Sequence, residues 1–513
     1  MKHAGLCLLP VILCLSLLAS AQVPKAQAAS GTAEQRTARY FESIRTQPAL
    51  LYAFLREMPK GADLHNHLTG SVYAESYIQW AADSDVCITR ATLTSTAAPC
   101  KDGQVEARQA LTDALLYREL IDAWSMRGWP ASQKSGHDHF FDTFGLFNAA
   151  GNGRFGDMLA ELARRNAEGN VQYLELMFSP DFGAAIGVGR QAGWDDDFGR
   201  MREKMLPGLR ETNAQARKNI DAMEARRDEL LNCRDANKMR LEPGCGVTMR
   251  YVFQVLRGFP REQVFAQILA AFELATADPR VVAFNLVMPE DALVPMRDFR
   301  LHMRMISYLK EIYPNVHITL HAGELAPGLV PPDGMRFHIR ESIQDGKAER
   351  IGHGVDLMYE DEPFALLEEM AKKNIMVEIN LTSNDAILGV KGKQHPLALY
   401  LKHGVPVALS TDDEGVARSE MTREYQKAVE EQGLDYLTLK KMARTGLQHA
   451  FLPGASLWSD AKKFTPVKEC ASDKPLARLL TATCQKFLDG SDKAREQWNF
   501  ERSLAEFESV GRQ

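Results

Sequence analysis

Residues 281–324 read VVAFNLVMPEDALVPMRDFRLHMRMISYLKEIYPNVHITLHAGE, and this stretch carries the clearest pattern of secondary structure in the chain. Two apolar runs of strand length, Val281–Met288 and Val316–His321, enclose the helical pattern of Phe299–Tyr313. Apolar side chains continue through both runs with little alternation, which is typical of parallel strands buried on both faces. The stretch therefore predicts a strand–helix–strand unit whose two strands are parallel.

The same alternation of strand-length and helix-length segments extends in both directions. Eight strands, each followed by a helix, predict a (β/α)8 TIM barrel. A doubly wound open sheet is the alternative. The other expected strands are Ala62–His65, Val171–Phe178, Val247–Val255, Arg350–His353, Ile375–Asn380 and Val405–Ser410. The other expected helices are Phe155–Glu168, Glu262–Ala277, Phe364–Asn374 and Pro396–His403.

Several segments do not belong to the minimal barrel, which we expect over residues 59–455. Residues 29–58 carry a broken apolar stripe and predict an N-terminal helical segment. Residues 84–133 and 195–242, approximately, are expected to be helical insertions on the barrel's loops. Residues 456–513 are expected to form a C-terminal helical extension.

Residues 1–28 have the pattern of a secretory signal peptide. A basic start precedes an apolar run over residues 6–18, and small-residue cleavage patterns follow at 19–21 and 26–28. The apolar run is too short to span a bilayer, although a membrane anchor or a buried first helix is the alternative. We therefore expect a periplasmic or secreted protein, with no membrane as a partner.

The cysteines agree with export. Two of the eight fall in the expected signal and six lie beyond it. An even number in an exported chain indicates disulfides, and neighbour pairing is the simplest of the fifteen possible connectivities. Each neighbour bridge would close a loop of about a dozen residues and stabilise the fold by roughly 2–3 kcal/mol. The neighbouring couples are Cys87 with Cys100, Cys233 with Cys245, and Cys470 with Cys484.

The overall composition excludes few classes of function. The 513 residues are 45% hydrophobic and 25% charged, as in an ordinary globular protein. The net charge of −6 gives no electrostatic reason to expect nucleic acid or an anionic membrane as a partner. This net charge is compatible with a small or uncharged substrate.

Ligand-type side chains stand at the carboxyl ends of four expected strands. Residues two apart in a strand point to the same side, so His65 and His67 can bind one metal ion. All eight carboxyl ends of a barrel face one mouth, where active sites of this fold are built. Satisfied polar packing is the alternative, but four such ends together favour a site. The ends read His65-Asn66-His67, His321-Ala322-Gly323-Glu324, Gly352-His353-Gly354 and Thr411-Asp412-Asp413.

These motifs and their order resemble the adenosine deaminase family of metal-dependent amidohydrolases. The opening Met58–Gly70, MPKGADLHNHLTG, is similar to the family's first motif, and its MPKG start is similar to the secreted adenosine deaminase growth factors. The resemblance covers about residues 55–450. It implies a hydrolase that converts adenosine and 2′-deoxyadenosine to inosine and ammonia. The further matching segments are 283–287, 321–324, 349–354, 378–384 and 410–413.

The resemblance implies one Zn²⁺ per chain and a set of catalytic residues. Glu324 would protonate purine N1, and His353 would orient or deprotonate the metal-bound water. Asp413 would accept a hydrogen bond from the purine edge at N7 or steer the hydroxide. A zinc ion lowers the pKa of water to about 7, although iron, cobalt or manganese would also suit such ligands. The implied zinc ligands are His65, His67, His321 and Asp412.

The sequence departs from the family pattern where the substrate is expected to bind. Thr69 replaces a carboxylate expected near the ribose 5′-hydroxyl, which would admit a 5′-phosphate or another 5′ substituent. Met288 stands where the family places a glycine close to purine N3, unless the alignment is shifted by one residue. Glu414 follows the two aspartates in place of the common proline. The residues expected to contact substrate are Thr69, Gly323, Met288 and Asp413.

Other polar residues are weaker indications of a functional site. His137-Asp138-His139, which precedes several phenylalanines, is interpreted as part of an aromatic wall near the pocket, and a second metal site is the alternative. Glu175, inside an expected strand, is either a structural acid or a carboxylate that lines the barrel. Five further histidines are expected to be structural or exposed: His302, His317, His338, His395 and His403.

Three hypotheses about function remain. The first is an exported deaminase of adenosine and deoxyadenosine. The second is a deaminase of another aminopurine or of an N6-substituted nucleoside or nucleotide. The third is a binding or growth-factor-like module with a vestigial site, which the complete set of ligands and acid–base groups argues against. A homodimer is possible, because the helical insertions offer surfaces for one.

Overall fold

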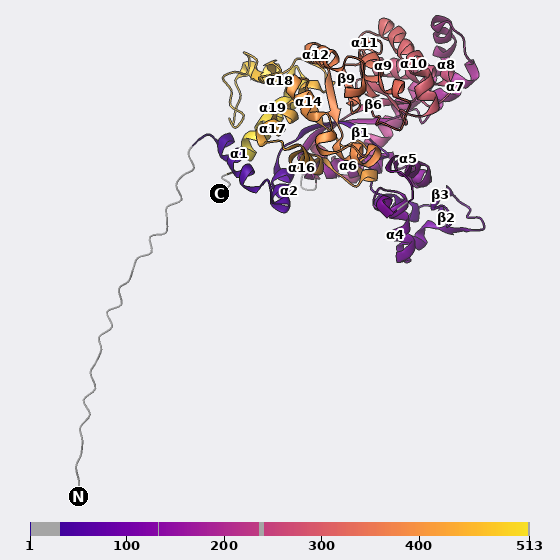
Figure 1. The fold of residues 1–513 in the computed structure, drawn as a ribbon, viewed down its shortest axis with the longest axis horizontal. Coiled ribbons are helices and arrows are strands. Elements are labelled where there is room, and N and C mark those ends of the chain that lie inside the picture. Colours follow the sequence, from indigo (N-terminus) through magenta and orange to yellow (C-terminus); the bar gives the residue numbers. More distant parts are fainter. Residues whose placement is uncertain (2–30, 132, 235–240, 511–513) are drawn as a thin grey trace.

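The computed structural model describes residue 1 and residues 31–131, 133–234 and 241–510, so residues 2–28 of the expected signal lie outside the described residues. Eight parallel strands form one sheet in the order β1-β5-β6-β7-β8-β9-β10-β11. Helices surround this sheet (Figure 1). The expected (β/α)8 TIM barrel is confirmed.

The barrel strands agree with the expected runs to within a few residues. β1 is longer than expected, because it continues through the histidine motif, and β11 is shorter. The bounds are β1 Gly61–His67, β5 Val171–Phe178, β6 Thr248–Leu256, β7 Val281–Val287, β8 His317–Ala322, β9 Arg350–His353, β10 Met376–Ile379 and β11 Val407–Leu409.

The sheet closes through residues of the candidate site. Asn66 forms a parallel bridge with Asp412, beyond the end of β11. The Asp412 N–H donates to the carbonyl of His65 at 2.8 Å, and the His67 N–H donates to the carbonyl of Asp412 at 3.1 Å. The open-sheet alternative is therefore wrong, and the closing hydrogen bonds fix three site residues relative to one another.

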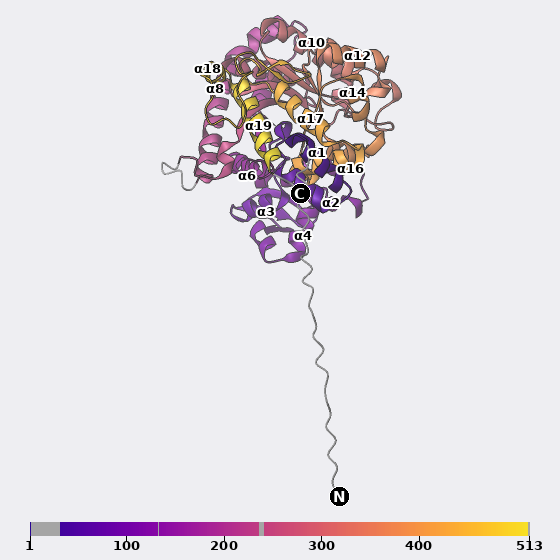
Figure 2. The ribbon, with the colours of Figure 1, turned by 90° about the vertical axis from the view of Figure 1, so that its left-hand side faces the viewer.

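Helices that follow the strands cover the outside of the barrel (Figures 1 and 2). Helices α9 and α10 have buried faces that pack on each other and, for α9, on strands β6 and β7. The barrel helices are α6 Phe155–Glu168, α7 Ala184–Ala192, α8 Phe198–Leu230, α9 Arg261–Ala277, α10 Leu293–Ile312, α11 His338–Gln344, α12 Pro363–Lys373, α13 Leu381–Leu388, α14 Leu397–His403, α15 Glu414–Ala417, α16 Met421–Gln432 and α17 Tyr436–His449.

Part of the barrel interior is charged. The fully buried guanidinium of Arg350 on β9 lies 2.6 Å from Glu175 Oε2 on β5 and 2.7 Å from Glu378 Oε1 on β10. The same guanidinium is 4.0 Å from the ring centroid of Phe451. Glu175 is thus a structural acid, as one of the two sequence interpretations held.

The first insertion differs from the helical expectation. After α3 (Ala74–Ala82) it forms a three-stranded antiparallel sheet of β2 Val86–Thr89, β3 Thr94–Ala97 and β4 Gln104–Glu106. Helices α4 Ala114–Ala123 and α5 Gly136–Phe147 follow. These strands are three or four residues long and rich in threonine, so no helical or alternating pattern marks them. In Figure 1 this unit projects from one side of the barrel, beyond α5.

The second insertion contains the long helix α8, as expected. Cys233 and Cys245 are bonded after its end, Cys87 is bonded to Cys100 in the first insertion, and Cys470 is bonded to Cys484 near the C-terminus. These are the neighbour pairs that the sequence favoured.

The terminal segments pack on one another. Helices α1 Ala33–Ile44 and α2 Pro48–Glu57 lie beside α17 and α19 (Figure 2), and Phe54 contacts Phe507 with ring centroids 5.2 Å apart. The C-terminal extension is not wholly helical, because the short strands β12 Trp458–Asp460 and β13 Thr465–Pro466 precede α18 Ala482–Asp489 and α19 Asp492–Ser509. Across the part of the chain that the structure describes, no helix has the length and apolarity to cross a membrane.

Candidate metal centre and active site

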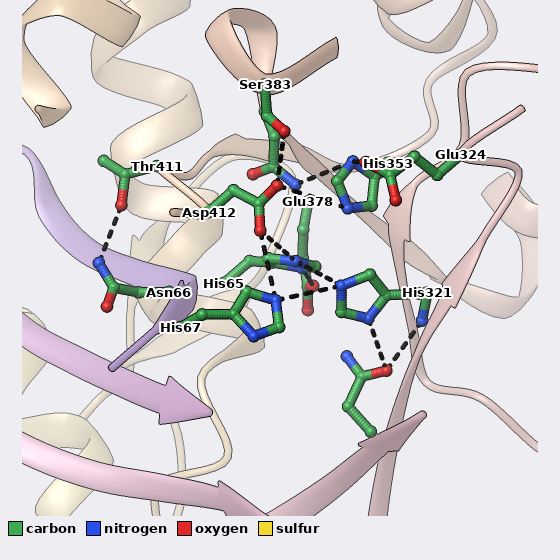
Figure 3. Close-up of polar contacts among 12 residues, drawn as sticks. His65, Asn66, His67, His321, Glu324, His353, Glu378, Ser383, Thr411 and Asp412 are labelled. Atoms are coloured by element: carbon green, nitrogen blue, oxygen red, sulfur yellow. Dashed lines mark hydrogen bonds and ion pairs between the residues drawn. The ribbon is translucent and has the colours of Figure 1, made fainter. Parts of the chain in front are cut away.

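Three imidazoles and one carboxylate converge at the carboxyl end of the barrel (Figure 3). Nε2 of His321 lies 3.1 Å from Nε2 of His65 and 3.2 Å from Nε2 of His67. Oδ1 of Asp412 lies 3.4 Å from His65 Nε2 and 3.3 Å from His67 Nε2. The structure therefore brings together the four residues that the sequence proposed as metal ligands. All four are buried.

The hydrogen bonds of the outer ring nitrogens determine where the imidazole protons are. Each Nδ1 donates to a side-chain oxygen, so each neutral ring carries its proton on Nδ1 and a lone pair on Nε2. Three lone pairs at these separations repel one another unless a cation lies among them. The donor set therefore fits a metal ion. The acceptors are Glu378 Oε2 at 2.6 Å for His65, Gln254 Oε1 at 3.0 Å for His67 and Asn285 Oδ1 at 2.9 Å for His321.

The separations also fit the size of zinc. Two ligand atoms that bind one zinc ion at about 2.0–2.1 Å each can lie no more than about 4.2 Å apart. The four separations run from 3.1 to 3.4 Å and so lie within this limit. The second oxygen of Asp412, Oδ2, accepts a hydrogen bond from Ser383 Oγ at 2.7 Å, which leaves Oδ1 to face the histidines.

The electrostatics of the cluster favour one bound positive charge. Burial lowers the pKa of His65, but the neighbouring carboxylates of Asp412 and Glu378 outweigh burial and raise that pKa to about 10. Burial and the neighbouring imidazoles hold the pKa of His321 well below its ordinary value. A cation shared by the ligands satisfies the carboxylates without protonating any ring.

Three residues around the cluster have backbone conformations that L-residues rarely adopt. The φ angles are +61° at Asp412, +70° at His353 and +89° at Met288. Such strain persists where the surrounding structure enforces it and is concentrated at functional sites. The angle at Met288 is one that glycine adopts readily.

Two glycines make room for site residues. A Cβ at Gly70 would lie 1.5 Å from Asp413 Oδ1, and a Cβ at Gly352 would lie 2.6 Å from His65 Cε1. The Asp413 carboxyl and the His65 ring can therefore take their positions only because both neighbours lack a side chain.

Glu324 lies in the loop after β8, beside the cluster. Its backbone N–H donates to Glu290 Oε2 at 2.8 Å, whereas its own Oε1 is buried without a hydrogen-bond partner among the described residues. Burial raises the pKa of Glu324 well above its ordinary value, and the charges of Asp412 and Glu290 raise it further. Glu324 therefore holds a proton, and its Oε1 lies 3.5 Å from Nδ1 of His353, which is too far for a strong hydrogen bond.

A chain of hydrogen bonds fixes the tautomer of His353. The Leu397 N–H donates to His395 Nδ1 at 3.1 Å, so His395 carries its proton on Nε2 and donates it to Asn384 Oδ1 at 3.1 Å. The amide Nδ2 of Asn384 then donates to His353 Nδ1 at 2.9 Å. Burial lowers the pKa of His353 to about 3, so the ring is neutral with its N–H on Nε2. That nitrogen lies 3.9 Å from Asp412 Oδ2.

A cavity of about 390 Å³ opens onto the cluster. Glu324 and Asp413 line its polar part, together with ligand residues, and α5 supplies an aromatic wall. Burial raises the pKa of Asp413 to about 8, and its Oδ1 is buried without a hydrogen-bond partner among the described residues. The aromatic wall consists of Phe140, Phe141 and Phe144.

The expected substrate-contacting residues are not all at the cavity. Thr69, Met288 and Asp413 line it. Gly323 is not among the lining residues, and its N–H donates to Glu290 Oε1 at 3.1 Å. The residues near His137 form the aromatic wall, as one interpretation held, but they are no second metal site: His137 Nε2 contacts Asp291 Oδ1 at 3.0 Å, whereas His139 Nε2 donates to the Ser125 carbonyl.

The sequence interpretation missed the residues behind the ligands. Glu378 on β10, Gln254 on β6 and Asn285 on β7 orient the three imidazoles. Each is a polar residue inside an otherwise apolar strand run, which is the signal that marks them, because buried polar groups require a partner. The partners of His353 give no such signal.

Removal of the Glu378 carboxylate is expected to weaken metal binding. In Glu378→Gln the His65 ring loses a charged acceptor at 2.6 Å, and Zn²⁺ affinity is expected to fall about 10- to 100-fold in a chelator-competition titration. The matched control is Glu349→Gln, which alters a half-exposed Glu–His317 pair at 2.9 Å outside the site and is expected to leave affinity unchanged. Equal affinities in all three proteins would contradict the orienting role.

The chain is similar in sequence to known adenosine deaminases. An adenosine deaminase of Serratia proteamaculans is 38% identical over 138 residues, which are 27% of this chain and 38% of the relative. An adenosine deaminase of Vibrio cholerae is 34% identical over 151 residues, which are 29% of this chain and 42% of the relative. Each alignment thus spans less than half of the curated relative. The solved N6-methyl-AMP deaminase of Arabidopsis thaliana is 20% identical, with a TM-score of 0.49, and the match covers 78% of this chain and 94% of that one.

The family model described as adenosine deaminase matches residues 133–457, which is more than half of the chain. This match includes two of the four ligand residues, His321 and Asp412, and also Glu324 and His353. The first strand, with His65 and His67, precedes it and completes the cluster in space. The chain belongs to the adenosine deaminase family.

Proposed function

We propose that the protein is an exported zinc-dependent deaminase that hydrolyses adenosine and 2′-deoxyadenosine to inosine and ammonia. The observation that carries the proposal is the coexistence, in one cavity, of a four-ligand cluster suited to one Zn²⁺ and a buried, protonated Glu324. A purine amine is lost by hydrolysis when an activated water and an acid act on adjacent ring atoms.

His65, His67, His321 and Asp412 would hold the zinc ion, which would lower the pKa of a bound water to about 7 and so provide a nucleophile at neutral pH. Attack at C6 places negative charge on the adjacent nitrogen, N1. Glu324 donates its proton to N1, because burial holds that proton in place until a stronger base is formed. An acid with an ordinary pKa would already be ionised at neutral pH and would have no proton to give.

His353 and Asp413 position the reactants. Neutral His353 presents an N–H on Nε2, which donates to the attacking oxygen and cannot accept a proton, so its role is to orient the nucleophile. Purine N7 carries a lone pair and no hydrogen, so Asp413 binds it as a donor. The raised pKa of Asp413, about 8, supplies the proton for this bond. Orientation of the nucleophile by His353 is one of the roles that the resemblance implied, whereas donation by Asp413 replaces the acceptor role that it implied, because N7 has no hydrogen to give.

The reaction consumes one water. Its oxygen becomes the 6-oxo group of the product, and the C6–amine bond breaks. One proton of the water leaves with ammonia, and the other restores the proton that Glu324 gave to N1. The chain is thereby returned to its starting protonation state.

A second candidate is a deaminase of another aminopurine or of an N6-substituted nucleoside on the same metal site. Met288 favours it, because its side chain lines the cavity at a position of glycine-like φ, with 37% of its surface exposed. A side chain there reshapes the space for the purine without altering the ligands or Glu324.

Export is supported by the leader pattern and by three disulfides, since disulfides persist in oxidising compartments. N-terminal sequencing of the mature protein tests it: cleavage after residue 21 or 28 is expected, and an intact leader in the mature protein would overturn it.

Metal removal tests the proposal directly. Release of the amine is measured with adenosine, deoxyadenosine, AMP, N6-methyladenosine and guanosine, before and after dialysis against a chelator; the amine is methylamine for N6-methyladenosine and ammonia for the others. We expect rapid release with the first two, loss of activity on dialysis, and recovery with one equivalent of Zn²⁺ per chain. Removal of the ion should also lower the melting temperature, because a ligand of the folded state stabilises it.

Other outcomes distinguish the alternatives. Turnover confined to N6-methyladenosine or guanosine would select the second candidate. Turnover of AMP alone would assign a nucleotide substrate. If the protein retains no zinc and releases neither ammonia nor methylamine from any of these compounds, the binding-module hypothesis is favoured instead.

A further inference from the structure

A second and larger cavity adjoins the one that contains the metal cluster. Its volume is about 840 Å³, against about 390 Å³ for the first. Thr69, Gln254 and Leu256 line both cavities and so form the boundary between them. Gln254 also accepts the hydrogen bond from the ligand His67, so the boundary lies one side chain from the cluster. A ligand longer than the first cavity would extend into the second.

The second cavity is lined mainly by apolar and uncharged side chains. Phe155 on α6, Phe178 at the end of β5 and Ile186 on α7 face it from three elements, and Ala222 of the inserted helix α8 faces it from a fourth. Its amides include Asn219, whose Nδ2 donates to the Pro180 carbonyl at 2.8 Å. The boundary residues carry no charge either.

The single charged side chain among the described residues that line this cavity is already paired. Nη1 of Arg226 lies 2.8 Å from Glu229 Oε2, and Nε lies 3.5 Å from Asp157 Oδ2. The first cavity adds the carboxyl groups of Glu324 and Asp413 and no lysine or arginine. A phosphate carries about −1.5 to −2 charges at neutral pH and would meet no unpaired cation along either lining.

One wall of the second cavity is an aromatic pair in an unusual conformation. The ring of Phe182 stacks on Phe155 with centroids 4.7 Å apart and an interplanar angle of 22°. Phe182 has a φ of +51°, and 52% of its surface is exposed. A strained backbone that presents an aromatic ring to an open cavity is an arrangement found at binding sites.

We propose that the second cavity binds an uncharged, apolar substituent on the 5′ carbon of the nucleoside, such as an alkyl or aryl thioether in place of the hydroxyl. This inference rests on the proposed function, which puts C6 of the purine at the cluster. C6 and the sugar-bearing N9 lie at opposite ends of the purine, so the sugar is directed away from the ligands. Water replaces the amine as before, and the products are the 5′-substituted inosine and ammonia.

The test compares substrates that differ only at the 5′ carbon. The specificity constant kcat/KM is measured with the zinc-loaded protein for adenosine, for 5′-deoxy-5′-(methylthio)adenosine, for the benzylthio analogue and for AMP. We expect both thioethers to be deaminated at least as efficiently as adenosine, and AMP at least about 100-fold less efficiently, because its phosphate has no unpaired cation.

Two variants on helix α8 test whether the 5′ substituent is bound in the second cavity. Ala222→Trp on α8 fills the second cavity, whereas Ala225→Trp adds the same side chain three residues later, at an exposed position outside its lining. For the benzylthio analogue, Ala222→Trp is expected to lower kcat/KM about 10-fold or more. For adenosine the change should stay within about 2-fold, and Ala225→Trp should leave both substrates unchanged.

Failure of the subsite inference can be distinguished from failure of the proposed function. If adenosine is deaminated but the thioethers are not, or if AMP is the better substrate, the subsite inference is wrong and the proposed function stands. Equal losses for adenosine and the benzylthio analogue in Ala222→Trp would also overturn it. If no compound, adenosine included, releases ammonia, the proposed function itself has failed and the inference falls with it.

Discussion

Glu324→Gln is expected to lower kcat/KM for adenosine by about 10²- to 10⁴-fold, which is the range for loss of a general acid. The substitution is nearly isosteric, and the backbone N–H of residue 324 would keep its bond to Glu290. The amide can still donate a hydrogen bond to N1 but cannot transfer its proton. The loss should therefore appear in kcat, with KM and the inhibition constant of inosine changed little.

The variant must be shown to retain its metal. Glu324 is not among the four ligands, so the zinc content is expected to stay at one ion per chain. A variant that loses both zinc and activity would indicate a structural role for Glu324 and would contradict its assignment as the acid.

Asp356→Asn provides a matched control. Asp356 is fully buried, burial raises its pKa well above the ordinary value, and neither of its oxygens has a partner among the described residues. It does not line the cavity. A neutral amide in place of an already protonated carboxyl should leave kcat/KM within about 3-fold of the parent protein. If Asp356→Asn lowers kcat/KM as much as Glu324→Gln does, the loss is a general effect of altering a buried acid near this loop. Such a result would contradict the role of Glu324 as the proton donor.

The barrel was predictable because its strands are buried on both faces. Continuous apolar runs such as Val281–Val287 contrast with the polar helices around them, so the pattern identifies them without structural information. The sheet of β2, β3 and β4 was not predictable, because its three- and four-residue strands are half-exposed and carry no periodicity. The Cys87–Cys100 bridge holds that sheet, and cysteine spacing alone does not specify strands.

The ligand residues were predictable because strand ends concentrate them. His65 and His67 are two apart in one strand, and that spacing fixes their common side. The chain of hydrogen bonds from Leu397 through His395 and Asn384 to His353 was not predictable. It depends on how helix α13 and the loop before α14 pack behind β9, and nothing in the spacing of those residues reveals it.

Arg350→Met is expected to destabilise the protein by about 3–5 kcal/mol, the typical cost of removing one partner from a buried ion pair. Arg350 is fully buried between Glu175 and Glu378, at 2.6 Å and 2.7 Å, and its loss leaves two carboxylates in the barrel interior. Burial alone would raise the pKa of Glu378, yet Arg350, followed by His65, lowers it to about 2. Without the guanidinium, Glu378 becomes a weaker acceptor for His65, so Zn²⁺ affinity should fall as well.

The measurement is urea unfolding followed by tryptophan fluorescence, with Arg300→Met as the control. Arg300 pairs with Glu341 at 2.8 Å, but 67% of its side-chain surface is exposed, so its removal should cost no more than about 1 kcal/mol. Adding Glu175→Gln to Arg350→Met removes one of the two stranded charges and should recover part of the loss. If Arg350→Met unfolds at the same urea concentration as Arg300→Met, the interior carboxylates do not depend on Arg350, and its role in orienting the metal ligand through Glu378 is wrong.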